Sequence, residues 1–181
     1  SAASDVYKRQ VMRPMVFEFM NDPAVPYLDQ QYMLGDALLV APVFREDKTA
    51  QYYLPEGTWT ELLTGETKEG GRWYQGTYDY FSMPLYIREN SIVVRGNCDT
   101  RPDYDYADHA TVCVYQLKDA AETKVPDVHG NTVFTVKAVK EGDAVKVSVE
   151  GAHTELKVEV FVGNEKKEAV LAADADEVVV A

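Results

Sequence analysis

Strict alternation of apolar and polar side chains is the clearest pattern in this chain, and it fills the C-terminal third. Each alternating run has valine, leucine or phenylalanine on one face and mainly lysine, glutamate, serine or threonine on the other. That two-residue period predicts β-strands with one buried face and one solvated face. The expected strands are residues 132–136, 144–149 and 156–162, with hairpin turns at 140–143 and 150–152. Residues 177–180 are expected as a last edge strand. Residues 120–181 are therefore expected to form a distal antiparallel β-sandwich-like domain.

The middle of the chain is built of shorter apolar runs separated by glycine, proline and asparagine. Several short strands at close spacing predict an antiparallel sandwich or barrel. The expected strands are residues 51–54, 58–63, 78–81, 84–88, 91–95 and 111–117. Residues 44–119 are accordingly interpreted as a proximal β-domain.

The first interpretable segment, residues 11–43, has a different pattern. Residues 11–20 and 37–43 are apolar almost throughout, which is typical of strands buried on both faces in a parallel sheet. Residues 23–34 between them have helical spacing, and Gly35 ends that helix. The pattern predicts a β-α-β unit that needs further strands of an α/β barrel beside it.

Residues 1–10 do not resemble the rest of the chain. They contain no apolar stretch of the kind found in a secretory signal peptide. We interpret them as a non-native leader and leave them out of the fold prediction.

The charge of the chain narrows the classes of partner. The formal net charge is −12 and the isoelectric point about 4.6. An acidic chain is repelled by phosphate backbones and anionic lipid surfaces, so neither nucleic acid nor a membrane is an expected partner. No apolar run reaches the roughly 18 residues that a membrane-spanning helix needs. At 46 % hydrophobic residues, the chain can build a packed core.

Metal and phosphate chemistry find no support in the sequence. Cys98 and Cys113 have no zinc-ligand spacing, and His109, His129 and His153 are far apart along the chain. Both cysteines are expected as free thiols. Neither a glycine-rich phosphate loop nor a nucleophile elbow is present.

Three groups of side chains are candidates for chemistry, and each has a structural alternative. Asp29 and Asp36 could form an acid/base pair, but a surface helix and a turn explain them better. Residues 101–106 combine tyrosines and carboxylates that can hold sugar hydroxyls, or they form an ordinary loop. The aromatic residues of 59–81 could form a carbohydrate platform, but a sandwich core is the favoured interpretation.

Four motifs resemble the end of the barrel and the following domain in glycoside hydrolase family 31. Residues 12–19 match an R-P-x-x-x-E-F strand, and residues 35–43 match a Gly-Asp step followed by L-L-V-A-P-V. Residues 53–60 are similar to Y-L-P-x-G-x-W, and residues 81–92 resemble L-P-V-Y-V-R-x-N-S/T-I. The segment from Gly96 to Tyr104 resembles the G-N-N-D-x-R-P-D-Y loop of bacterial α-xylosidases, with Cys98 in place of the second asparagine.

The resemblance implies that the parent is a retaining, exo-acting α-xylosidase, which hydrolyses terminal α-xylosyl residues of oligosaccharides without metal or organic cofactor. The chain by itself is expected to be inactive. The alternatives are an α-glucosidase of the same family and a non-catalytic carbohydrate-binding β-sandwich. The nucleophile and acid/base aspartates of the family lie upstream of Val11, so no catalytic residue is assigned here, and Asp22 at a strand end receives no role. The free cysteines and the bacterial relatives favour the cytoplasm, and the parent enzyme is a candidate homo-oligomer.

The fold expected from pattern and resemblance together is mainly β. Residues 1–10 are a leader, residues 11–43 are the last strands of a (β/α)8 barrel, and residues 44–119 and 120–181 are the proximal and distal β-domains. Apolar side chains of 11–20 and 36–43 are expected to be exposed where missing barrel strands would cover them.

Overall fold

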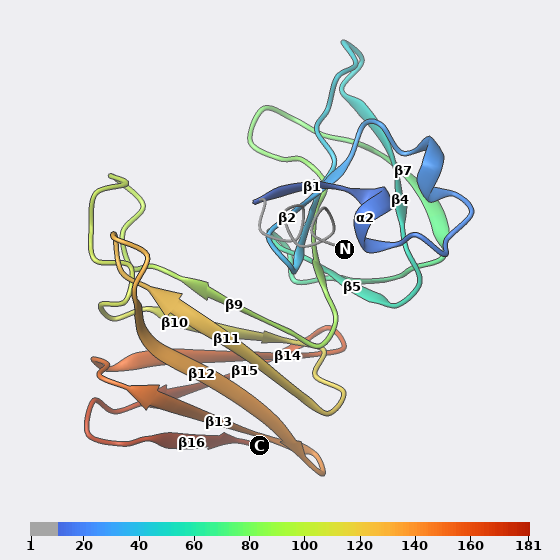
Figure 1. The fold of residues 1–181 in the computed structure, drawn as a ribbon. Helices are drawn as coiled ribbons and strands as arrows, with labels where there is room; N and C mark the ends of the chain where they lie inside the picture. Colours follow the sequence, from blue (N-terminus) through green and yellow to red (C-terminus); the bar gives the residue numbers. More distant parts are fainter. Residues whose placement is uncertain (1–10) are drawn as a thin grey trace, which may run out of the picture. The chain divides into compact units, whose positions relative to one another are not determined.

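The computed structural model describes residues 11–181, and the expected leader lies outside these residues. The chain divides between Arg88 and Glu89 into two compact units, each with its own apolar core (Figure 1). The described residues are mainly β-strand, in four sheets. No helix among them is long and apolar enough to span a membrane.

The first unit contains a six-stranded sheet in the order β1-β2-β3-β8-β5-β6 and a separate pair, β4-β7. All strand pairs described in it are antiparallel. Its elements are β1 (Met12–Pro14), α2 (Met15–Glu18), the 3-10 helix η1 (Val25–Tyr27), β2 (Tyr32–Leu34), β3 (Leu38–Val40), β4 (Thr49–Leu54), β5 (Thr58–Glu61), β6 (Thr67–Glu69), β7 (Arg72–Thr77) and β8 (Leu85–Arg88).

The β-α-β unit expected in residues 11–43 is wrong. β1 pairs antiparallel with β2, and β2 pairs antiparallel with β3 through the turn at Gly35. The apolar run of 11–20 is a three-residue strand followed by the helix α2, and the helix expected over 23–34 is only the 3-10 turn η1. From an apolar run of this length alone, a parallel strand cannot be told from an antiparallel strand. A strand cannot be told from a buried helix either.

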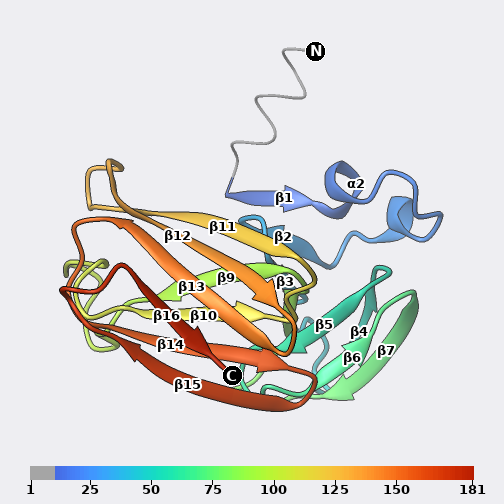
Figure 2. The same cartoon turned by 90° about the horizontal axis from the view of Figure 1, so that it is seen from below.

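The second unit is a sandwich of two four-stranded sheets, β15-β14-β10-β9 and β11-β12-β13-β16 (Figure 2). All neighbours in it are antiparallel except β10 and β14. Its strands are β9 (Ser91–Arg95), β10 (Thr111–Tyr115), β11 (Ala120–Pro126), β12 (Thr132–Glu141), β13 (Ala144–Gly151), β14 (Leu156–Val162), β15 (Glu165–Leu171) and β16 (Glu177–Val180).

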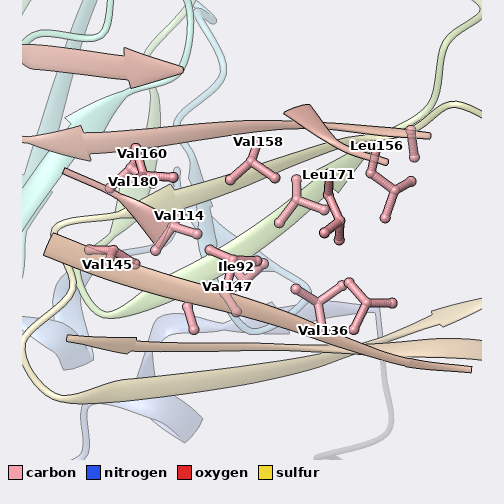
Figure 3. Close-up of a cluster of buried hydrophobic side chains, with 14 of the residues drawn as sticks. Ile92, Val114, Val136, Val145, Val147, Leu156, Val158, Val160, Leu171 and Val180 are labelled. Carbon is pink, nitrogen blue, oxygen red and sulfur yellow. The ribbon is translucent and has the colours of Figure 1, made fainter. Parts of the chain in front are cut away.

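The alternation seen in the sequence builds the core of this sandwich. Val145 and Val147 of β13 face Val158 and Val160 of β14 across the space between the sheets (Figure 3). The hairpin expected at 140–143 joins β12 and β13. The hairpin expected at 150–152 is wrong, because the chain leaves β13 there and enters the other sheet as β14.

The strands group differently from the expected three segments. β9 and β10, which lie within residues 44–119, form one sheet with β14 and β15. Residues 44–119 are thus divided between the two compact units. Strand β10 pairs with β14 because each presents a valine every second residue to the same core.

Candidate functional site

A small hollow on the first unit gathers aromatic and polar side chains. It has a volume of about 180 Å³ and lies where the chain after η1 passes strands β4 and β7. Its lining residues are Tyr27, Leu28, Asp29, Gln30, Gln31, Gln51 and Trp73. Concave sites of mixed aromatic and hydrogen-bonding character are the usual places for small-molecule binding.

Gln31 fastens one wall of the hollow to strand β4. Its Nε2 donates to the carbonyl oxygen of Tyr53 at 2.8 Å, and its Oε1 accepts from the Tyr53 backbone N–H at 2.8 Å. The Gln31 side chain is buried, so both bonds are shielded from water. Residues 27–30 are thereby held beside β4 without being part of a sheet.

Trp73 forms another part of the lining and stays 55 % exposed. Its ring packs against Tyr53, with 5.6 Å between ring centroids and a tilt of 57°. Tyr53 is fixed in turn, because its hydroxyl donates to Asp22 Oδ2 at 2.9 Å. Burial and this bond to the carboxylate raise the pKa of Tyr53 above its ordinary value, so the hydroxyl stays protonated and can donate even in alkaline solution.

Asp22, which received no role in the sequence analysis, therefore supports an aromatic side chain. It also accepts from the backbone N–H of Ala24 at 3.0 Å. Its contacts are those of a structural residue.

A second hollow of about 350 Å³ shares residues 28–31 with the first. It is more apolar and more open, and Met12, Pro14, Tyr32, Pro42 and Phe44 are among the residues that line it. The segment 28–31 is thus common to both concave surfaces of this unit.

Tyr52 and Tyr86, which lie outside the stretch 59–81 considered as a platform, form a polar cluster with Lys68 inside the first unit. Lys68 Nζ donates to the hydroxyls of Tyr52 at 3.0 Å and Tyr86 at 2.7 Å, and those two hydroxyls are 2.8 Å apart. Lys68 also lies 5.1 Å from the ring centroid of Tyr74. Burial, followed by the bond to Tyr52, raises the pKa of Tyr86, which excludes it as a general base near neutral pH.

The aromatic residues of 59–81 separate into core and surface. Trp59 is buried, whereas Trp73, Tyr80 and Phe81 are exposed. The core interpretation of this stretch is confirmed for Trp59, and the platform interpretation stays a prediction that only the exposed aromatic residues could meet. Tyr27 and Gln51, which complete the hollow, had no signal in the sequence.

The two candidate aspartates have different surroundings. Asp36 Oδ1 accepts from Arg13 Nη2 at 2.6 Å and lines neither hollow, whereas Asp29 lines both. Arg13 is buried and also forms an ion pair with Glu18 at 3.3 Å. The role of Asp36 is to pair with this arginine.

The loop of residues 101–106 is held by its own aromatic contacts. Tyr104 and Tyr106 pack edge to face at 4.9 Å, and Tyr106 donates to the Pro102 carbonyl oxygen at 2.7 Å. Tyr104 also covers Gly96, where an added Cβ atom would clash with the tyrosine ring and hydroxyl. These contacts match the structural interpretation of the loop.

The two cysteines are free thiols in different surroundings. Burial is the main reason that the pKa of Cys113 is raised to about 11. The Cys113 Sγ also lies 3.7 Å from Glu159 Oε2. Hydrogen bonds from Thr100 and from the backbone of Thr100 and Arg101 lower the pKa of partly exposed Cys98. Over residues 11–181, no three His, Cys, Asp or Glu side chains are grouped closely enough to hold a metal ion.

Iodoacetamide at pH 8 should therefore alkylate Cys98 at least about a hundredfold faster than Cys113, because only the thiolate reacts. Peptide mass spectrometry measures both rates, and a Cys98→Ser variant should retain only the slow reaction. The Cys113 rate should rise steeply up to about pH 11. Equal rates at pH 8 in the folded protein would contradict the burial of Cys113.

Two family models match successive parts of the chain. Residues 8–93 match the Glycosyl hydrolase family 31 C-terminal domain. The chain belongs to glycoside hydrolase family 31, as the four sequence motifs indicated. Within that family, residues 105–181 match the model described as Alpha-xylosidase YicI, C-terminal domain.

Individual relatives agree with this assignment. The chain is 32 % identical over 167 residues to Alpha-xylosidase XylQ of Lactiplantibacillus pentosus, covering 90 % of this chain and 22 % of the relative. It is 28 % identical to Alpha-glucosidase 2 of Bacillus thermoamyloliquefaciens, covering 86 % and 19 %. The GH31 alpha-xylosidase structure from Xanthomonas citri superposes with a TM-score of 0.74 at 28 % identity, covering 98 % and 22 %. The chain spans about a fifth of the length of these relatives.

Proposed function

We propose that this chain is the C-terminal portion of a retaining, exo-acting α-xylosidase of family 31. The observation that carries the proposal is the order of the two matched models, a family 31 C-terminal domain followed by an α-xylosidase C-terminal domain. The nucleophile and acid/base carboxylates belong, in this proposal, to a part of the enzyme other than residues 11–181. The substrate is an oligosaccharide with a terminal α-xylosyl residue, and the two free cysteines suit a reducing cytoplasm.

The surface of the first unit supports a larger parent. Val11, Met12, Phe17, Met20 and Phe44 are all exposed apolar side chains. Exposed apolar side chains of this number within a short stretch mark a surface that another protein segment covers. We assign that segment to the catalytic barrel of the parent enzyme, with residues 11–43 as the part of this chain next to it.

Residues 36–43 contribute less to this surface than expected. Leu39, Val40 and Ala41 are buried, because β3 lies between β2 and β8 in the six-stranded sheet. The apolar surface is therefore formed by side chains of residues 11–20 together with Phe44, which follows the expected strand 36–43.

An α-glucosidase is the second candidate, and the match to Alpha-glucosidase 2 favours it. A free-standing carbohydrate-binding sandwich is less well supported, because residues 8–93 match an enzyme family model. The substrate preference rests on pocket residues of the parent that this chain does not supply.

Hydrolysis of p-nitrophenyl α-xyloside and α-glucoside by the product of the complete coding sequence tests the proposal. The expected result is faster turnover of the xyloside by the complete enzyme and no turnover by residues 1–181 alone. Replacing the nucleophile aspartate of the barrel should abolish turnover. Preference for the glucoside would establish the α-glucosidase alternative. A complete protein without a barrel would overturn the proposal that the parent is a family 31 enzyme.

A further inference from the structure

We propose that the hollow at Trp73 is a non-catalytic subsite that binds the terminal pyranose ring of a neutral oligosaccharide. This inference goes beyond the proposed function, because it needs no hydrolysis and no residue outside the first unit. It rests on the chemistry of the lining, on the rigidity of that lining and on its size.

The lining matches the surface of a sugar ring. Trp73 and Tyr27, which are 55 % and 80 % exposed, offer aromatic surface to the C–H face of a pyranose. Asp29 accepts hydrogen bonds, and the amides of Gln30 and Gln51 both donate and accept, which suits hydroxyl groups. A pyranose ring has an apolar C–H face bordered by hydroxyl groups. An aromatic surface bordered by groups that bind hydroxyls is complementary to it.

The charge of the lining selects against anions. Among the described residues that line the hollow there is no lysine, arginine or histidine, and the carboxylate there is that of Asp29. Phosphates and carboxylates lack a cationic partner in this lining and are repelled by the aspartate. A neutral polyol is therefore a better fit than a phosphorylated ligand or an acidic sugar.

Gln31, Gln51 and Trp73 are held in place before any ligand arrives. Gln31 fixes the wall through its two bonds to Tyr53, and Tyr53 supports the ring of Trp73. Gln51 Nε2 donates to Gln75 Oε1 at 2.9 Å across β4 and β7. A pre-formed site loses less conformational entropy on binding than one that must be assembled.

The size of the hollow limits the ligand. A volume of about 180 Å³ is below the roughly 300–1,000 Å³ of deep ligand pockets, so it accommodates one ring and leaves the rest of the oligosaccharide in solvent. So small a contact area predicts weak affinity, with a Kd on the order of 1 mM.

Titration of the 181-residue chain with isomaltotriose and with methyl α-xyloside tests the subsite. The chain has two tryptophans, and Trp59 is buried, so a change in fluorescence of the exposed tryptophan reports on Trp73. A saturable change with either sugar is expected, and none with inorganic phosphate. Saturation-transfer NMR of the same sugars measures binding in variants that lack the tryptophan.

Trp73→Ala should weaken binding at least about tenfold, and Gln51→Ala should weaken it by a smaller factor. Phe81→Ala is the matched control, because Phe81 is an exposed aromatic of the same unit that does not line the hollow, and it should bind as the unchanged chain does. Trp73→Phe retains a smaller aromatic face, so it replaces Trp73→Ala as the test variant if Trp73→Ala does not fold. Absence of saturable binding to both sugars, or equal binding by all variants, would overturn the subsite. Either result leaves hydrolysis by the complete enzyme unaffected, so it is separable from the proposed function.

Discussion

Replacing Gly151 by alanine is expected to lower the free energy of unfolding of the sandwich by about 3 kcal/mol or more. Gly151 ends β13 with a φ angle of +119°, a conformation that side chains rarely adopt. It also pairs with Phe134 of β12, and a Cβ atom would lie 2.6 Å from the Val133 carbonyl oxygen and 2.9 Å from the Phe134 Cα. Both contacts are with backbone, so relief requires the two strands to move apart.

Gly142→Ala is the matched control for this variant. Gly142 lies in the β12–β13 turn with a φ angle of +65°, and no described atom lies within 4 Å of the position that its Cβ would take. Only the backbone conformation is then disfavoured, at about 1–2 kcal/mol. Both tryptophans lie outside this unit, so tryptophan fluorescence does not report on the sandwich. Hydrogen exchange of peptides from β12 and β13 measures the loss of unfolding free energy in each variant. Equal losses in the two variants would show that the strands adjust to the extra methyl group.

The strands of the sandwich were predictable where burial on one face imposed alternation. β12, β13 and β14 were expected from that pattern and are confirmed. β15 was missed, because its sequence begins Glu-Lys-Lys-Glu and buries little. Its place is set by pairing with β14 at the sheet edge, where charged side chains face solvent, and local sequence does not encode such a pairing.

The first unit was harder to predict because several of its strands are only three residues long. β1, β2 and β3 are too short to show either the two-residue period of a strand or the 3.6-residue period of a helix. Their apolar character comes from burial beside neighbouring strands, which looks the same in parallel and antiparallel sheets. Pairing partners that are distant in sequence, such as β3 and β8, decide the arrangement.

The hollow shows the same limit for a functional site. Its parts come from residues 27–31, from Gln51 and from Trp73, which no local motif connects. Trp73 was within the aromatic stretch considered as a platform, but Gln31 has its role only because Tyr53 lies opposite it. Contacts between distant segments create the site, so spacing along the chain could not reveal it.

Trp59→Ala is expected to lower the free energy of unfolding of the first unit by about 3–5 kcal/mol. Trp59 is 1 % exposed, its Nε1 donates to the Pro55 carbonyl oxygen at 2.7 Å, and its ring lies 6.2 Å from that of Phe19. Alanine would leave a cavity among the buried side chains and an acceptor without its donor. Trp59→Phe keeps most of the volume, so its loss should be about 1–2 kcal/mol.

Trp73→Ala is the comparison variant, because it shows how much the other tryptophan of this chain contributes to the free energy of unfolding. Trp73 is half exposed and packs on the ring of Tyr53, so its loss should cost about 1 kcal/mol or less. Urea unfolding followed by hydrogen exchange of peptides from β4, β5 and β7 measures all three variants. A larger loss for Trp73→Ala than for Trp59→Ala would make Trp73 a core residue and remove the exposed aromatic surface on which the sugar subsite depends. The expected order instead assigns Trp59 to stability and leaves Trp73 available for binding.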